Sequence, residues 1–183
     1  MEIQVKPMMI KPRRLSAKLA AGLVLLALLA ACSHAGPAAV AQEPGNDTAC
    51  ALDGMFLKDF PGPKAQIHYA EGKPDFFCDL LEMFSTLLTP EQKRPVTAAF
   101  VQDMGKTDWD HPSGNWINAK TAFYVVGSRK HGSMGPTFGS FSSMQAAEKF
   151  AQTEGGKVLR FEQITPDMAD LSGGVVHDTT MSH

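Results

Sequence analysis

The sequence has no hydrophobic run long enough to cross a membrane. Its longest apolar run, residues 19–31, holds 13 residues of Leu, Ala, Val and Gly only, whereas a membrane-spanning helix needs about 20 apolar residues. Five basic residues precede this run: Lys6, Lys11, Arg13, Arg14 and Lys18. Basic residues followed by a short apolar run are typical of an export signal, so we expect residues 1–31 to be a signal peptide.

The end of this run, Leu29-Ala30-Ala31-Cys32, resembles the lipobox of bacterial lipoproteins. The resemblance implies cleavage before Cys32 and acylation of this residue by diacylglycerol and a fatty acid such as palmitate, which together give stable anchoring. The alternative is an ordinary cleaved signal with a chance cysteine. We expect residues 32–47, which are small, polar and rich in Pro and Gly, to form an acylated tether. The chain would then lie on the periplasmic side, and Ser33 in place of a retention-signalling Asp favours the outer membrane.

The mature chain also lacks an excess of basic residues. Residues 1–31 contain five of the 17 basic and one of the 19 acidic residues, which leaves 12 basic and 18 acidic residues and a net charge of −6. Nucleic-acid binding depends on positive charge that neutralises phosphates, so we expect no nucleic-acid partner. The remaining 152 residues suit one compact domain.

Cysteine is scarce, with three residues in the whole chain. If Cys32 carries lipid, Cys50 and Cys78 remain. In an oxidising compartment two remaining cysteines pair by default, and this default competes with a metal-binding role for Cys50. Cys78 stands where a helix is expected to begin, a position typical of a small buried hydrophobe. We therefore expect both thiols to be reduced in the metal-loaded protein.

Recognisable catalytic motifs are absent from the sequence. It contains no Gly-rich phosphate loop, no His-x-x-x-His pair and no Gly-x-Ser-x-Gly elbow. A catalytic carboxylate pair cannot be identified from spacing either. We therefore assign no catalytic residue and expect a protein that is not an enzyme.

Two segments with the same order of elements make up the rest of the chain. Helices with capping-box spacing are expected after Asp79, with Glu82, and after Ser142, with Gln145. Apolar periodicity places Met83 and Met144 on the core faces of these helices. The repeat predicts an α+β fold of two similar ββαβ-type halves with mostly antiparallel sheets. The expected strands are 64–70, 76–77, 96–102, 122–126, 137–141 and 158–164, in a folded part 48–164 with halves 48–104 and 105–164, followed by a disordered tail 165–183.

Soft metal donors lie in loops that contain glycine. The stretch 50–55 holds the thiol of Cys50, the carboxylate of Asp53 and the thioether of Met55. Thiolate and thioether sulfurs favour Cu(I) over hard ions. Met104 and Met134 also adjoin glycines, so either could be a ligand or could fill a packing gap.

Taken together, these motifs resemble the NosL family, copper-binding lipoproteins accessory to nitrous oxide reductase. The resemblance covers about residues 50–164. It implies two ββαβ-type halves and a periplasmic Cu(I) chaperone for denitrification, whose partners are nitrous oxide reductase and its maturation machinery and whose cargo serves the copper–sulfide centre. Many family members carry a second cysteine where Asp53 stands here. The motifs that carry the resemblance are Cys50-x-x-Asp53-x-Met55, residues 61–68, Val101-Gln102-Asp103-Met104-Gly105, Trp116-Ile117-x-Ala119, residues 122–128, Met134-Gly135 and residues 150–161.

The expected Cu(I) site takes a thiolate from Cys50 and a thioether from Met55, with Met134 or a histidine completing it. Asp53 is expected to orient the loop by hydrogen bonding. Met104 and His68 are further candidates for the metal or for its surroundings. Two rival hypotheses remain: a thiol enzyme that uses Cys50 and Asp53, and a structural lipoprotein with a Cys50–Cys78 disulfide and no metal.

Overall fold

A computed structural model of the chain describes residues 39–91 and 94–171. The expected signal peptide, the acylated Cys32 and the first part of the expected tether therefore lie outside the described residues, as does the end of the expected tail. Within the described ranges, none of the helices combines the length and apolar character that a membrane span requires.

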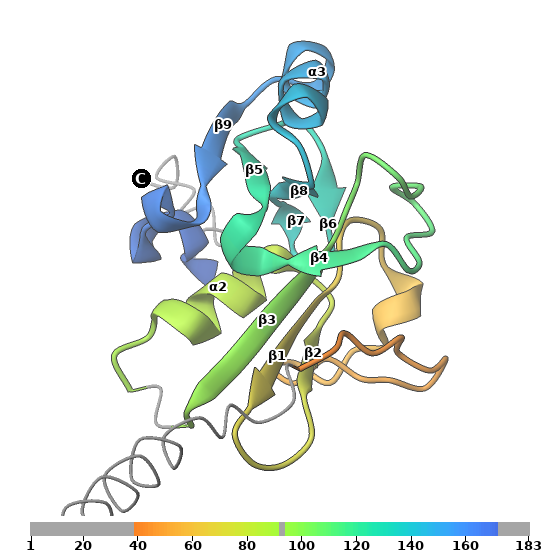
Figure 1. The fold of residues 1–183 in the computed structure, drawn as a ribbon. Coiled ribbons are helices and arrows are strands. Elements are labelled where there is room, and N and C mark those ends of the chain that lie inside the picture. The colour runs from red at the N-terminus through yellow and green to blue at the C-terminus, as the bar shows by residue number, and fades with distance from the viewer. Residues whose placement is uncertain (1–38, 92–93, 172–183) are drawn as a thin grey trace, which may run out of the picture. The chain divides into compact units, whose positions relative to one another are not determined.

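The first half of the folded part is a four-stranded antiparallel sheet with one helix (Figure 1). Its strands β1 (Ala65–Tyr69), β2 (Asp75–Phe77) and β3 (Val96–Gln102) form the order β2-β1-β3. Strand β4 (Trp116–Asn118) follows the predicted boundary at residue 104 but extends the β3 edge of this same sheet. The helix α2 (Leu80–Leu88) connects β2 to β3. Pro74 and Pro90 stand outside these elements, as expected of residues that cannot donate a backbone hydrogen bond.

The second half repeats this arrangement. Strands β5 (Phe123–Val126), β8 (Gly139–Phe141) and β9 (Lys157–Arg160) form an antiparallel sheet in the order β8-β5-β9, and α3 (Met144–Glu154) connects β8 to β9. In both halves the first strand is central, the second and the third flank it, and the helix follows the second. The prediction of an α+β fold with two similar ββαβ-type halves is confirmed.

A small hairpin interrupts the second half between β5 and β8. It consists of β6 (His131–Gly132) and β7 (Gly135–Pro136), joined by Ser133 and Met134. The first half has no such insertion between its first two strands, where a short turn follows Tyr69. The hairpin therefore distinguishes the two halves, and it bears directly on the candidate site.

Helix α2 joins the two halves through its buried face. Asp79 caps it as predicted, because its carboxylate accepts a hydrogen bond from the Leu81 N–H (2.9 Å). The Phe84 ring is fully buried, with centroid distances of 5.0 Å to Tyr124, 5.8 Å to Phe138 and 5.4 Å to Phe161. All three partners belong to the second half, so one aromatic side chain of the first half packs against a cluster from the other.

The start of α3 differs from the prediction by one residue. Ser143, not Ser142, is the N-cap, and its Oγ accepts a hydrogen bond from the Ala146 N–H (3.2 Å). Met144 was expected in the core, but it is the first helical residue and 49% of its surface is exposed. The core lies under the later turns, where Ala147 is fully buried and Phe150 packs beside it.

Part of the expected tether is bound to the sheet. Gln42 and Gln66 exchange two hydrogen bonds of 2.8 and 2.9 Å between the Gln42 backbone and the Gln66 amide. Glu43 accepts a hydrogen bond from Trp116 Nε1 (2.7 Å). The prediction that residues 32–47 form a tether is therefore wrong at Gln42 and Glu43, because these two residues hydrogen-bond to side chains on the sheet.

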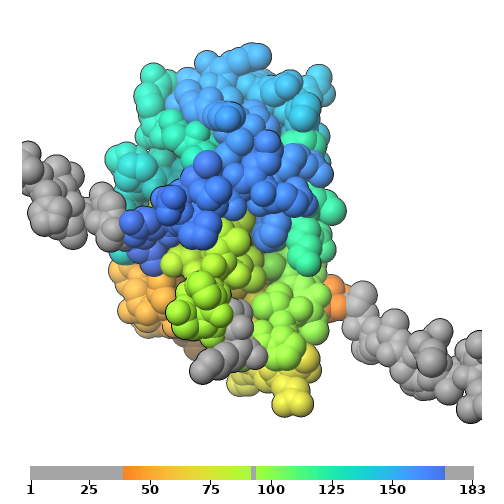
Figure 2. All heavy atoms as spheres, turned by 90° about the vertical axis from the view of Figure 1, so that its left-hand side faces the viewer, coloured from red at the N-terminus to blue at the C-terminus, as the bar shows by residue number. Residues whose placement is uncertain are grey.

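The folded part also extends beyond its predicted end. Strand β9 ends at Arg160, and the 3-10 helices Phe161–Gln163 and Pro166–Ala169 follow it. Ala169 is buried in the core, and this segment lies against α2, as the blue and yellow-green atoms in Figure 2 show. The prediction of a disordered tail from residue 165 is therefore wrong as far as residue 171, because this segment packs against α2 and buries Ala169 there.

Candidate metal centre

Four side chains meet beside the N-terminus of α2. Cys50, Asp53, Cys78 and Glu82 each offer a sulfur or oxygen atom, and these four atoms lie within 4.8 Å of one another. Cys50, Cys78 and Glu82 are buried, and Asp53 is exposed. Two thiols and two carboxyl groups in this arrangement have the ligand types and the spacing of a metal site.

A tight loop positions Cys50 and Asp53. The Cys50 N–H donates to the Met55 carbonyl (2.8 Å) and the Gly54 N–H donates to the Cys50 carbonyl (3.0 Å). Gly54 has a φ of 77°, which glycine adopts without steric cost. Asp53 forms the hydrogen bond to the loop that we expected, since its Oδ1 accepts from the Met55 N–H (2.9 Å).

The start of α2 positions Cys78 and Glu82. Cys78 directly precedes the N-cap Asp79 and lies outside the helix, and the capping box turns the Glu82 carboxyl group back toward it. Glu82 Oε2 lies 3.1 Å from Cys50 Sγ and 3.3 Å from Cys78 Sγ, and it also accepts a hydrogen bond from the Asp79 N–H (3.2 Å). Glu82 therefore bridges both thiols. Its Oε1 is buried without a hydrogen-bond partner.

The two thiols and Glu82 cannot all be ionised at such short range. A hydrogen bond from Cys78 lowers the pKa of Cys50 to about 6, while its contact with Cys50 raises the pKa of Cys78. Burial raises the pKa of Glu82 to about 9. Near neutral pH the buried part of the centre therefore holds one negative charge, on Cys50, with protons on Cys78 and Glu82. A single thiolate of this kind is ready to bind a soft cation.

We expect the two thiols to differ in reactivity in the metal-free protein. Only thiolates are alkylated, and a lowered pKa means that Cys50 becomes a thiolate as the pH rises through about 6. Its alkylation rate should therefore increase from pH 5 to 7 and then level off, while Cys78, whose pKa is raised, should react far more slowly. Peptide mass spectrometry after timed iodoacetamide treatment measures both sites. A rate for Cys50 that keeps rising up to pH 9 would contradict the assigned charge state.

The hairpin β6–β7 and the loop 50–55 bring two methionines near the centre. Ser133 Oγ lies 3.2 Å from Cys78 Sγ, and the next residue, Met134, has 45% of its surface exposed. Met55 is half-buried and packs against the core cluster that contains Cys50 and Cys78. Both methionines therefore neighbour residues that belong to or contact the cluster.

Met104 and His68 occupy other places in the fold. Met104 packs against a second core cluster, formed by Val125, Phe141 and Ala147 of the second half. His68 is a buried β1 residue whose Nε2 lies 2.8 Å from Gln66 Oε1, and its ring packs edge-on against Phe100. The structure does not bring either residue into the cluster of Cys50 and Cys78.

The sequence pattern did not single out Cys78 or Glu82 as site residues. Cys78 was expected to be a buried hydrophobe, and Glu82 was identified by its capping-box spacing alone. A usable signal was present, because Cys78 and Glu82 are separated by one helical turn and the capping box points the Glu82 carboxylate back toward the start of the helix. That spacing does not reveal that the loop at Cys50 lies next to them.

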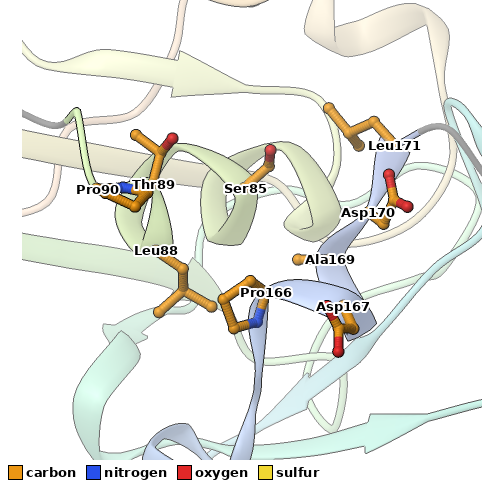
Figure 3. A pocket seen from close by; sticks show the side chains of 9 residues that line it. All are labelled: Ser85, Leu88, Thr89, Pro90, Pro166, Asp167, Ala169, Asp170 and Leu171. Atoms are coloured by element: carbon orange, nitrogen blue, oxygen red, sulfur yellow. The ribbon is translucent and has the colours of Figure 1, made fainter.

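A cavity lies at the other end of α2. It has a volume of about 420 Å³, and Figure 3 shows it between the last turn of α2 and the segment that contains the 3-10 helix Pro166–Ala169. Its lining contains no cysteine, methionine or histidine. The lining residues are Ser85, Leu88, Thr89, Pro90, Pro166, Asp167, Ala169, Asp170 and Leu171.

Comparisons with known proteins agree on one family. The sequence model of the NosL family matches residues 41–169. The chain is 42% identical over 150 residues to the copper-binding lipoprotein NosL of Achromobacter cycloclastes, covering 78% of this chain and 77% of that protein. It is 39% identical over 134 residues to the copper-binding lipoprotein NosL of Stutzerimonas stutzeri, covering 70% of each. The crystal structure of the copper chaperone NosL from Shewanella denitrificans matches with a TM-score of 0.68 at 40% identity, covering 72% of this chain and 99% of that one.

Proposed function

Because this chain belongs to the NosL family, we propose that it is a copper chaperone that binds Cu(I) at Cys50 and Cys78. The observation that carries the proposal is the pair of unpaired, buried thiols on either side of one carboxyl oxygen. Thiolates select soft Cu(I). The printed names of the relatives, copper-binding lipoproteins and a copper chaperone, support the same cargo.

The donor set combines the sequence-based candidates with the newly found thiol. Cys50 supplies the thiolate, Cys78 the second sulfur, and Met55 or Met134 can add a thioether. The carboxyl groups of Asp53 and Glu82 are hard donors that suit Cu(I) poorly, so their role is to hold the loop, through Asp53, and to hydrogen-bond both thiols, through Glu82. The net charge of −6 of the mature chain favours the approach of a cation.

The rival reading as a thiol enzyme has one observation in its favour, the lowered pKa of Cys50. A thiol enzyme also needs a substrate pocket at its nucleophile, and the cavity of about 420 Å³ described above lies at the other end of α2, away from Cys50. A bound Cu(I) ion needs no such pocket. The hypothesis of a structural lipoprotein without metal requires a Cys50–Cys78 disulfide, and both cysteines are free. Cargo binding therefore accounts for the centre best.

The family and the N-terminal sequence support a proposed setting for this function. The acylated Cys32 anchors the protein to a membrane, in our proposal the outer membrane, with the folded part in the periplasm. There it passes Cu(I) to the machinery that builds the copper–sulfide centre of nitrous oxide reductase. A carrier of this kind binds copper stoichiometrically and turns nothing over.

The proposal predicts a copper-deficient reductase when the two thiols are lost. In a denitrifying host whose own gene for this protein is deleted, the wild-type chain should restore the copper content of nitrous oxide reductase. A Cys50→Ser, Cys78→Ser double variant should leave most of the copper–sulfide centre unassembled, because no soft anionic donor remains. Elemental analysis and nitrous oxide consumption by the purified reductase measure the outcome.

Met144→Leu is the matched control. It removes a soft donor from an exposed helix position and should restore copper fully. A double serine variant that is secreted normally and also restores copper fully would contradict the proposed function. Turnover of a thiol-dependent reaction by the metal-free protein would support the enzyme reading instead.

A further inference from the structure

The hairpin β6–β7 belongs to the second half of the chain but lies against the metal centre of the first half. It contacts Cys78 directly through Ser133 Oγ (3.2 Å). Its backbone N–H at Ser133 donates to Asp79 Oδ2 (3.2 Å). Cys78, a proposed ligand, and Asp79, the cap of α2, therefore both form a hydrogen bond with Ser133 of the hairpin.

Asp79 receives hydrogen bonds from both halves. Oδ1 accepts from the Leu81 N–H of α2 (2.9 Å) and from the Thr137 hydroxyl just after the hairpin, and Oδ2 accepts from the Ser133 N–H. Only 1% of Asp79 is exposed. A helix N-cap needs one such bond, and N-caps normally lie at the surface. The additional partners at Ser133 and Thr137 are therefore not explained by capping.

The fit between hairpin and carboxylate is close. A Cβ atom at Gly132 would overlap Asp79 Oδ2 and would lie 3.0 Å from Thr137 Cγ2. Any side chain at this position would therefore push the hairpin away from Asp79. Glycine at position 132 lets the backbone approach the carboxylate closely enough for the bond from Ser133.

We infer that Asp79 is a positioning residue that fastens the hairpin β6–β7 over the copper-binding thiols. Through this contact Asp79 keeps Ser133 on Cys78. The inference deepens the proposed function and rests on it for its effect on copper. Its effect on the exposure of Cys78 does not depend on copper at all.

A buried lysine also lies close to Cys78 and Asp79. Lys64 Nζ donates to the Cys78 carbonyl (3.2 Å) and to the carbonyls of Phe60 and Pro61. Its charge acts on Cys78, Asp79 and Glu82 together. The positive charge of Lys64 therefore offsets part of the desolvation cost of burying the Asp79 carboxylate. The hydrogen bonds from Leu81, Ser133 and Thr137 fix the orientation of that carboxylate.

The substitution Asp79→Asn separates capping from fastening. The amide oxygen can still accept from Leu81 and Thr137, so α2 stays capped. The amide NH2 then faces the Ser133 N–H, and two donors cannot bond to each other. We expect the hairpin to loosen, Cu(I) affinity to fall by about tenfold or more, and transfer to a Cu(I) chelator to become faster, as for other residues that orient ligands. In the metal-free protein, alkylation of Cys78 should become at least about tenfold faster, because local opening exposes it.

Two further variants make the test decisive. Thr137→Val keeps the side-chain shape and the α2 cap but removes the hydroxyl that donates to Asp79. It should therefore lower the Cu(I) affinity and speed the alkylation of Cys78, each by a smaller factor than Asp79→Asn. This variant still tests the inference if Asp79→Asn does not fold. Ser143→Ala removes the N-cap of α3, and it should lower stability without changing Cu(I) affinity or Cys78 protection.

Wild-type protection of Cys78 in folded Asp79→Asn and Thr137→Val proteins would overturn the inference, whatever their copper affinity. Wild-type protein that binds no Cu(I) would overturn the proposed function, and the alkylation readout would still decide the role of Asp79.

Discussion

Replacing Cys50 with serine is expected to lower the Cu(I) affinity of the mature protein by more than about 100-fold. Loss of a residue that only orients a ligand costs about 10- to 100-fold in metal affinity, and Cys50 is proposed to bind the metal itself. Because the pKa of Cys50 is lowered to about 6, this thiol carries the negative charge of the centre at neutral pH. Serine keeps the shape but supplies neither a soft sulfur nor a charge. Anaerobic competition with a Cu(I)-specific chelator measures the change.

The other sulfur donors should form a graded series below Cys50. Cys78→Ser should also lower the Cu(I) affinity by a large factor, since it removes the second thiol beside Glu82. Met55→Leu should weaken binding by a smaller factor, because it removes a neutral donor and keeps volume, and such swaps usually cost under about 1.5 kcal/mol in stability. Met144→Leu is the control, and its affinity should equal that of the wild type.

The same series measured with Zn(II) tests selectivity for Cu(I). We expect the wild-type protein to prefer Cu(I), because its sulfur donors are soft. Wild-type Cu(I) affinity in the Cys50→Ser protein would refute the proposed site despite the family relationship. A larger loss for Met55→Leu than for Cys50→Ser would show that the thioether, and not the thiolate, dominates binding.

Replacing Phe84 with alanine is expected to lower the free energy of unfolding by about 3–5 kcal/mol, the range for large aromatic truncations in a core. Phe84 is fully buried and packs against the rings of Tyr124, Phe138 and Phe161. Its loss leaves a cavity between the two halves. A single domain is stable by about 5–15 kcal/mol, so the variant should be only marginally folded at physiological temperature. Urea unfolding followed by circular dichroism measures the loss.

Phe56→Ala is the matched control, because it removes the same ring from a site that is 48% exposed. It should change the free energy of unfolding by much less than Phe84→Ala. Equal losses for the two variants would show that the aromatic cluster around Phe84 does not join the halves. Two separate unfolding transitions in Phe84→Ala would show that the halves unfold independently once this contact is removed.

Local sequence signals determined most of the architecture. The capping box at Asp79 and Glu82 and the apolar periodicity after it predicted α2, and the strand 96–102 matches β3. The repeat of strand, strand, helix and strand predicted both halves. These features depend on neighbours within a few residues, such as the N–H groups of a first helical turn, so they can be recognised in the chain itself. The motif Cys50-x-x-Asp53-x-Met55 likewise indicated a soft metal loop.

Predictions failed where a segment's structure depends on distant partners. The segment at Gln42 and Glu43 looked like a free tether, but Gln66 and Trp116 bind it. The residues after Ile164 looked disordered, yet Ala169 is buried against α2. Neither segment has a local pattern of its own, because its order comes from surfaces supplied by other parts of the chain.

The composition of the metal centre was likewise decided by the tertiary structure. Cys50 and Cys78 are 28 positions apart, and their sulfurs meet at Glu82 only because the Cys50 loop packs beside the start of α2. The charge state also depends on this meeting, since the hydrogen bond from Cys78 is what lowers the pKa of Cys50. The sequence alone determined that a thiol and a thioether share a turn. The packing of the Cys50 loop beside α2 decided which second thiol joins them, and the packing of the two halves decided which hairpin covers that thiol. Such contacts depend on positions in space and not on spacing along the chain.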